Sequence, residues 1–174
     1  MGCDLFSLAT TGVQSLHPYQ PGKPVDELER ELGLSNIIKL ASNENPLGPS
    51  AKAINAIEAA FQDLSRYPDG GGFKLKAALS ARYDVASEQI TLGNGSNDLL
   101  EIIARTFADN TSDIIFSQYA FAVYPIVTQS IGAKAIEVPA VDWGHDLTAM
   151  AEAVTDNTKL IFIANPNNPT GTYV

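Results

Sequence analysis

The second half of the chain alternates short apolar segments with segments of helical periodicity, and this alternation constrains the fold more than any other feature. Residues 113–117, 135–138 and 159–164 are rich in Ile, Val, Leu and Phe and are predicted strands. Residues 121–131 and 147–154 are predicted helices. Strands that alternate with helices indicate an α/β fold with a mostly parallel sheet flanked by helices. Residues 159–164 are almost continuously apolar, so this strand is expected to be buried on both faces.

The first half is less regular. Residues 1–24 are predicted to form an N-terminal arm, because Pro18, Pro21 and Pro24 exclude regular helix or central strand around them. The predicted helices are 25–32, 51–64, 75–83 and 98–107, and the predicted short strands are 37–40 and 89–92. We expect residues 1–45 to form the arm and a small-domain segment, and residues 46–174 to form the first part of a large domain.

The chain ends at Val174, shortly after the last predicted strand and loop. Parallel strands need a crossover connection, usually a helix, and none follows here. The sequence is therefore expected to be the front part of a longer, truncated domain.

Composition excludes several classes of protein. The formal net charge of −9 argues against nucleic acid as a partner. The one cysteine, Cys3, permits no internal disulfide, and no Cys/His cluster has the spacing of a metal site. The N-terminus lacks the features of a signal peptide, and no apolar run approaches the roughly 18 residues of a membrane span. We expect a soluble, cytoplasmic protein.

Gly93–Asp98 is the first candidate site, because a glycine-rich turn here leaves a predicted strand and enters a helix. The free N–H groups of a first helical turn, and the helix dipole, favour a bound anion such as phosphate. Ser96 and Asn97 can add side-chain hydrogen bonds. The alternative is that Ser96 or Asn97 only caps the helix.

Two further candidates also follow predicted strands. Asn165–Gly171 is a proline-stiffened loop whose Asn168 amide could bond a ligand oxygen, or it is only a structural turn. Tyr119–Tyr124 could supply an aromatic ring that stacks on a flat ligand, although core packing is the commoner role of such rings. His17 and His145 have no nucleophile pattern near them, and the turn 142–146 is given no chemical role.

Five segments, in this order and spacing, resemble the fold-type I pyridoxal-phosphate (PLP) aminotransferases, and in particular the histidinol-phosphate aminotransferase branch. The segments are 40–49, 66–69, 93–98, 119–124 and 165–171. The resemblance covers nearly the whole chain. It implies that residues 46–174 are the first, incomplete part of a PLP-binding large domain.

The resemblance implies roles in binding the cofactor for five residues. Ser96 and Asn97 fall where the family cradles the phosphate of PLP, and Phe121 falls where a ring stacks on the pyridine. Asn168 falls where an amide bonds the pyridine 3-oxygen. Tyr67 falls where a tyrosine reaches the cofactor phosphate of the other subunit of a homodimer.

On the substrate side, the resemblance implies that Tyr19 contacts the phosphate of the substrate and that Asn43 belongs to a substrate-side motif. No catalytic residue is assigned. In relatives, the lysine that forms a Schiff base with PLP lies beyond the Asn-Pro-Thr-Gly loop, as do the aspartate beside the pyridine nitrogen and the arginine for the substrate carboxylate. The 174-residue chain alone is expected to be inactive and to bind PLP at most weakly.

For the full-length protein, the resemblance implies transfer of an amino group between histidinol phosphate and 2-oxoglutarate, forming glutamate, in histidine biosynthesis. Two alternatives stay open. One is a related PLP enzyme that acts on aromatic amino acids or threonine phosphate. The other is a non-catalytic dimerisation or binding module that keeps half of the fold.

Overall fold

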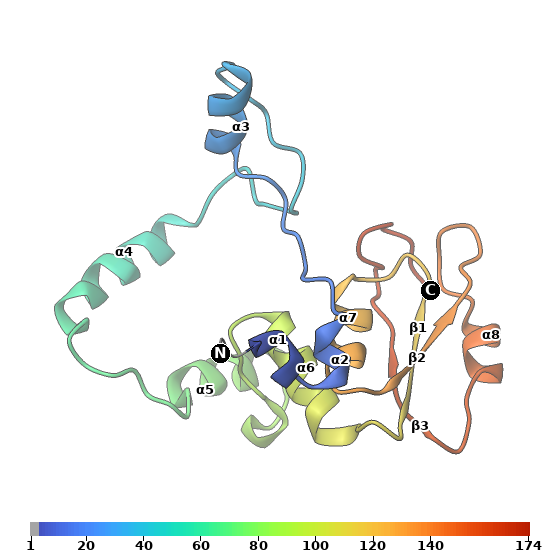
Figure 1. The fold of residues 1–174 in the computed structure, drawn as a ribbon. Helices are drawn as coiled ribbons and strands as arrows, with labels where there is room; N and C mark the ends of the chain where they lie inside the picture. The colour runs from blue at the N-terminus through green and yellow to red at the C-terminus, as the bar shows by residue number, and fades with distance from the viewer. Residues whose placement is uncertain (1–3) are drawn as a thin grey trace. The chain divides into compact units, whose positions relative to one another are not determined.

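The computed structural model describes residues 4–174 of the chain (Figure 1). Cys3 lies outside the described residues, so the expectation that it forms no internal disulfide is not tested by the structure. The chain divides into two compact units. One unit consists of the chain up to Tyr19 together with Thr91–Val174, and the other consists of Gln20–Ile90.

The first unit is built around a three-stranded parallel sheet with strand order β2-β1-β3. Its strands are β1 (Asp113–Ser117), β2 (Lys134–Val138) and β3 (Thr158–Phe162). Its helices are α1 (Leu5–Leu8), α2 (Thr11–Gln14), α6 (Ser96–Phe107), α7 (Val123–Ser130) and α8 (Leu147–Glu152). The alternation of strands and helices in the sequence therefore predicted this α/β architecture correctly.

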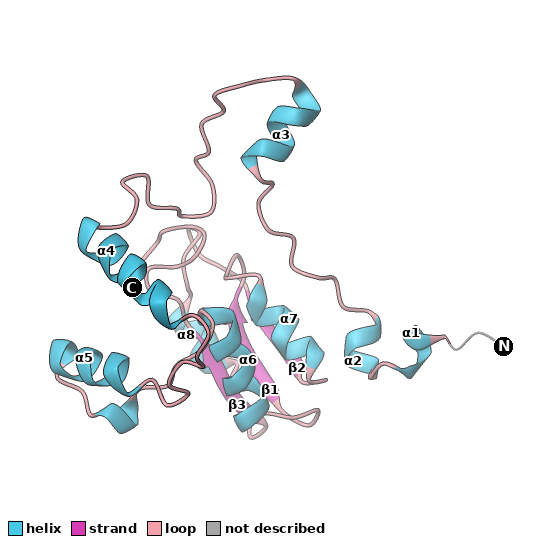
Figure 2. Ribbon diagram, turned by 90° about the vertical axis from the view of Figure 1, so that its left-hand side faces the viewer, coloured by secondary structure: helices cyan, strands magenta, loops and turns pink. Residues whose placement is uncertain are grey.

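Strand β1 is the centre of the sheet, and all five of its residues are buried. Its side chains alternate between the two faces, as the period of a strand requires. Ile114 and Phe116 belong to a core cluster with α6 and α7, whereas Ile115 packs with Met150 of α8. Figure 2 shows α6 and α7 on one face of the sheet and α8 on the other. Helices thus cover both faces of β1.

Strand β3 differs from its prediction. It pairs with β1 on one side only, and its residues alternate between half-buried and exposed before Phe162, which is buried. Ile161 is 44% exposed, and Ile163, just after the strand, is 47% exposed. The prediction that this strand is buried on both faces is therefore wrong for the described residues, where it is an edge strand.

The N-terminal arm contains two one-turn helices that the sequence did not indicate. Helix α2 contacts α7, and the Gln129 side chain donates a hydrogen bond to Ser15 at 3.0 Å. Gly12 lies so close to α7 that a Cβ atom would come within 2.2 Å of the Gln129 carbonyl oxygen. The proline-rich stretch after Leu16 is neither helix nor strand, as predicted.

The second unit holds short helices without a sheet. They are α3 (Val25–Leu32), α4 (Ala51–Ala60) and α5 (Phe73–Tyr83), with the 3-10 turns η1 (Phe61–Asp63) and η2 (Ser87–Gln89). Helix α4 begins at Ser50, whose hydroxyl accepts a hydrogen bond from the Ala53 amide, and α3 ends at Gly33 in the left-handed conformation.

The predicted strands at 37–40 and 89–92 are wrong, because neither segment pairs with another strand. A short apolar run is a strand only where a partner accepts its backbone hydrogen bonds. Among residues 4–174, the helices are all too short or too polar to cross a membrane.

Candidate ligand-binding site

A pocket of about 310 Å³ lies where three elements of the first unit meet. It is formed by the first turns of α6 and α7 and by the segment after β3. Its lining residues are Ser96, Leu99, Leu100, Phe121, Tyr124, Ala164 and Asn168. Three of the residues singled out in the sequence, Ser96, Phe121 and Asn168, therefore line one pocket. Its volume is at the lower end of the range for small-molecule sites.

The polar end of the pocket is the N-terminus of α6. Gly95 occupies the N-cap position and Ser96 is the first helical residue, so the alternative that Ser96 or Asn97 caps the helix is wrong. Since glycine has no side chain, it cannot satisfy the free N–H groups of the first turn. Those N–H groups and the helix dipole favour an anionic group beside Ser96.

The turn before α6 is held by its own contacts. The Asp98 carboxylate accepts a hydrogen bond from the Asn94 amide at 3.0 Å. A Cβ atom on Gly93 would lie 3.0 Å from the same carboxylate oxygen and 3.1 Å from a methyl carbon of Leu99. Gly93 thus allows the turn to close tightly onto the helix that follows it.

Aromatic rings form the apolar side of the site. The half-buried Phe121 meets Tyr124 edge to face, with ring centroids 5.9 Å apart, and Tyr124 stacks on Phe162 at 4.7 Å. Burial raises the pKa of the Tyr124 hydroxyl, so this group stays protonated near neutral pH. Tyr19, in the proline-rich part of the arm, meets the Phe121 ring edge to face at 6.3 Å. A flat ligand that contacted Phe121 would therefore find Tyr19 nearby.

Asn168 supplies an amide from the loop after β3. The side chain is half-buried and lines the pocket. The loop forms a structural turn, and its Asn168 lines the pocket, so the alternative that Asn168 bonds a ligand stays a prediction. Its neighbour Asn167 is buried and bonds to the loop after β1.

Four predicted residues do not line this pocket, and one of them is Tyr19, whose ring contacts Phe121. Asn97 is exposed on the first turn of α6. Asn43 and Tyr67 belong to the second unit, where both are exposed, and Tyr67 is fully so.

Sequence reasoning missed the contribution of residues 142–146. His145 is buried, and its Nε2 atom donates a hydrogen bond to the carbonyl oxygen of Ala164 at 2.8 Å. Trp143 packs against Tyr119 with ring centroids 4.9 Å apart. This turn therefore supports the segments that follow β1 and β3. Contacts between residues so distant along the chain leave no local pattern in the sequence.

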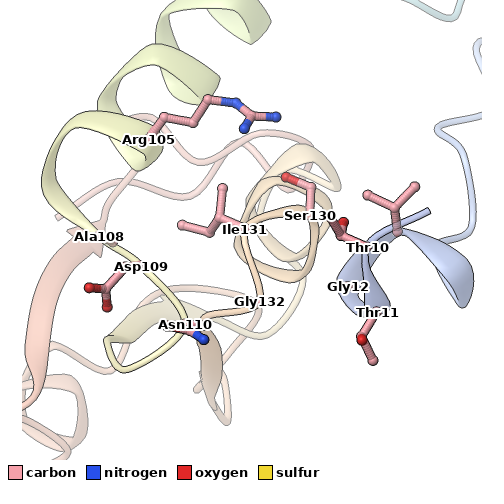
Figure 3. A pocket seen from close by; sticks show the side chains of 11 residues that line it. Thr10, Thr11, Gly12, Arg105, Ala108, Asp109, Asn110, Ser130, Ile131 and Gly132 are labelled. Carbon is pink, nitrogen blue, oxygen red and sulfur yellow. The ribbon is translucent and has the colours of Figure 1, made fainter. Parts of the chain in front are cut away.

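A larger hollow, of about 700 Å³, lies elsewhere in the first unit. Figure 3 shows Thr10–Gly12 on one side of it, Ser130–Gly132 at the end of α7, and Arg105 and Asp109 at the end of α6. The Arg105 side chain is paired with Glu101 at 2.9 Å. None of the residues predicted to bind a ligand lines this hollow, which lies beside the packing contact of the N-terminal arm.

The chain is thus an α/β protein with a parallel sheet, helices on both faces and a pocket at the carboxyl ends of its strands, which is where open α/β sheets bind ligands. The helix N-terminus, the aromatic ring and the amide together suit a flat ligand that carries an anionic group.

Comparison with known proteins identifies the family. A family model described as "Aminotransferase class I and II" matches residues 35–174, and the chain belongs to that family. Histidinol-phosphate aminotransferase 1 of Idiomarina loihiensis is 63% identical over 169 residues, which cover 97% of this chain and 46% of the relative. The enzyme of the same description from Mannheimia succiniciproducens is 63% identical over 166 residues, covering 95% and 45%. The chain spans about half the length of the curated relatives it matches.

A solved structure shares the fold. The structure of histidinol-phosphate aminotransferase from Sinorhizobium meliloti, in complex with pyridoxal-5'-phosphate, superposes with a TM-score of 0.84 at 28% identity. The match covers 95% of this chain and 44% of the other. The resemblance inferred from five sequence segments and the α/β fold class are both confirmed.

Proposed function

We propose that the protein to which this chain belongs is a PLP-dependent aminotransferase. It exchanges an amino group between histidinol phosphate and 2-oxoglutarate in histidine biosynthesis, yielding glutamate. The proposal is supported by relatives named histidinol-phosphate aminotransferase at 57–63% identity. It is also supported by the meeting of Ser96, Phe121 and Asn168 in one pocket.

That meeting is the observation that carries the proposal, because the pocket offers what PLP requires. The first turn of α6 provides N–H groups for the phosphate, with Ser96 and the neighbouring Asn97 beside them. Phe121 provides a ring face for the pyridine, and Asn168 provides an amide for its 3-oxygen. The pocket lining contains no charged side chain, so the helix N-terminus is its source of positive potential for the phosphate.

In the proposed chemistry, the cofactor supplies the reactive group and the chain binds and orients it. When bound, PLP withdraws electrons from the α-carbon of the amino acid. The residues of this chain orient the ring. Phe121 fixes its plane, Asn168 favours the ionised 3-oxygen by donating a hydrogen bond to it, and Ser96 anchors the phosphate end. None of the residues to which we assign a role is a catalytic lysine.

For the substrate side we propose that Tyr19 contacts the phosphate of histidinol phosphate. Its ring lies beside Phe121, at 6.3 Å between centroids, and the residue is 48% exposed, so part of it is accessible to a ligand. We further propose a cytoplasmic homodimer in which Tyr67 reaches the cofactor phosphate of the partner and Asn43 lies on the substrate side. The full exposure of Tyr67 is compatible with that role. The domain division at residues 45 and 46 is likewise proposed for the whole protein.

The test uses the protein encoded by the complete gene. Its absorbance is recorded with added PLP, and amino-group transfer from histidinol phosphate to 2-oxoglutarate is followed as glutamate formation. Aromatic amino acids and threonine phosphate are assayed in parallel. We expect a shifted PLP band and the highest kcat/KM with histidinol phosphate. A preference for another substrate would support the related-enzyme alternative, and the absence of both a PLP band and transamination would support the non-catalytic one.

A further inference from the structure

Asn167 organises the loop that follows β3. The residue is 4% exposed. Its main-chain N–H donates to the Thr172 carbonyl oxygen at 2.7 Å, and its own carbonyl oxygen accepts from the Gly171 amide at 2.8 Å. These two bonds close residues 167–172 into a compact turn. Asparagine is seldom buried so deeply unless its polar atoms have partners.

The side chain of Asn167 also reaches out of its own loop. Its Nδ2 atom donates to Thr170 Oγ1 at 2.8 Å and to the main-chain oxygen of Tyr119 at 3.2 Å. Because a carbonyl oxygen can only accept, the Tyr119 contact fixes which end of the amide is the donor. Both N–H groups of the amide therefore donate a hydrogen bond. The hydrogen bond to Tyr119 joins the loop after β3 to the loop after β1.

These two loops carry the groups that line the pocket. Asn168 follows Asn167 directly, and Phe121 lies two residues after Tyr119. Tyr119 itself has a positive φ of 57°, a conformation that costs a non-glycine residue free energy and persists only where neighbouring contacts hold it. The hydrogen bond from Asn167 is one such contact, and the packing of Trp143 on the Tyr119 ring is another.

The unpaired oxygen of the Asn167 side chain indicates that packing alone does not explain an asparagine at this position. Its Oδ1 atom is buried and accepts no hydrogen bond from any residue between 4 and 174. An unpaired buried acceptor is destabilising, and an apolar side chain of similar size would avoid that cost. The Nδ2 end of the side chain is the part that forms hydrogen bonds, to Thr170 and to Tyr119.

We propose that Asn167 is a positioning residue that fixes the amide of Asn168 relative to the ring of Phe121, and so sets the orientation of the cofactor ring between them. Asn167 does not line the pocket, so it acts through its neighbours. The inference rests on the proposed function, since it assumes that PLP binds in this pocket.

The test compares three variants of the full-length protein. Asn167→Leu keeps the approximate volume and removes both donor bonds, whereas Asn167→His returns an N–H donor. Thr170→Val is the matched control, because it removes the partner of Asn167 within the loop and leaves the bond to Tyr119. For each protein, PLP is titrated into the apo form, and the circular-dichroism band of bound PLP is recorded as a measure of ring orientation. Thermal unfolding of the apo form reports whether each variant is folded.

For Asn167→Leu we expect the Kd for PLP to rise about tenfold, equivalent to about 1.4 kcal/mol. The dichroism per bound PLP should fall by at least half. Asn167→His should recover part of both signals, and Thr170→Val should stay within about twofold of the wild type. If Asn167→Leu does not fold, Asn167→Ala provides the same comparison.

Two results would overturn the inference. One is an unchanged Kd and dichroism band in the folded Asn167→Leu or Asn167→Ala variant. The other is an equal change in Thr170→Val, which would assign the effect to the loop itself rather than to its bond with Tyr119. A wild-type protein that binds no PLP would instead contradict the proposed function, and the inference would fail with it.

Discussion

Gly95 sets the start of α6 through its backbone conformation. Its φ of +87° with ψ of 178° is a combination that side chains disfavour, yet a Cβ atom there would meet nothing within 4 Å. The need for glycine therefore comes from the backbone angle and not from crowding. The position of Ser96 as the first helical residue depends on this angle.

We predict that Gly95→Ala destabilises the protein by about 1–3 kcal/mol, since the substituted residue must adopt a strained backbone. It should also weaken PLP binding, because a shifted helix start moves the N–H groups beside Ser96. Denaturant unfolding and PLP titration measure the two effects. Gly70→Ala is the matched control, because Gly70 has no positive φ and no neighbour within 4 Å of its Cβ position. Equal stabilities of the two variants would contradict the prediction.

Asp109 holds the turn between α6 and β1. One carboxylate oxygen accepts hydrogen bonds from the Thr111 amide at 2.8 Å, the Thr111 hydroxyl at 2.7 Å and the Ser112 hydroxyl at 2.9 Å. The bonds from Thr111 and then Ser112 lower the pKa of the Asp109 carboxyl below its usual 3.8. A lowered pKa in the folded state means that the ionised form stabilises the fold above pH 3.8, and that this contribution disappears as the pH falls through the folded value.

We predict that Asp109→Asn lowers the Tm at pH 7 and that the difference from the wild type shrinks toward zero as the pH falls below 3.8. Thermal unfolding at a series of pH values measures it. Asp156→Asn, which removes a carboxylate from the exposed turn before β3, controls for the loss of one negative charge. A difference that stays constant down to pH 2 would show that the carboxylate charge is not the cause.

At the scale of single residues, three residues singled out in the sequence line the pocket. Phe121 and Asn168 follow strands and Ser96 begins a helix, and the carboxyl edge of a parallel sheet brings such positions together. Asn167 and His145 were not predicted. Asn167 reads as one more turn-forming residue, and its role depends on a bond to Tyr119, which is 48 positions away. His145 depends in the same way on Ala164.

At the scale of elements, periodicity predicted helices better than strands. The helices at 25–32 and 73–83 appear within two residues of their predicted bounds, because helical hydrogen bonds are local. The strands predicted at 37–40 and 89–92 are absent, since a strand needs a partner that its own sequence cannot reveal. The edge position of β3 was not predicted for the same reason, because its sequence does not reveal which strands lie beside it. Four-residue helices such as α1 and α2 are too short for periodicity to detect.

The contact between α2 and α7 gives a prediction that runs against helix propensity. Replacing a helical glycine with alanine ordinarily stabilises a helix by about 1 kcal/mol. At Gly12, however, the new Cβ atom would lie 2.2 Å from the Gln129 carbonyl oxygen and 3.2 Å from the Gly132 amide nitrogen, both of them main-chain atoms. We therefore predict that Gly12→Ala detaches α2 from α7.

Hydrogen exchange of residues 4–16 measures the detachment, and faster exchange in Gly12→Ala than in the wild type is expected. Ser15→Ala is the control, because it removes the hydrogen bond from Gln129 without adding an atom, and its effect should be smaller. Unchanged exchange in Gly12→Ala would mean that α2 does not dock closely on α7 in solution.

At the scale of the whole molecule, the core is unevenly distributed. Every buried apolar side chain of the described residues lies between Ala104 and Phe162. Residues 20–90 contain no buried residue, and α4 with the following turn leaves a row of apolar side chains exposed. These are Ile54, Ile57, Phe61 and Leu64, at 42%, 56%, 58% and 76% exposure. The stability of the 174-residue chain therefore resides in the first unit.

Since a helix of 10 residues is marginal in water without tertiary packing, α4 should open far more readily than the sheet. We predict that, in the 174-residue chain at micromolar concentration, the amides of α4 exchange with solvent within seconds, whereas those of β1 are protected for at least about a thousand times longer. Hydrogen exchange followed by mass spectrometry measures both in one sample. Equal protection of α4 and β1 at low concentration would show that the apolar row on α4 is covered within a single chain. Protection that grows with concentration would show instead that a second copy covers it.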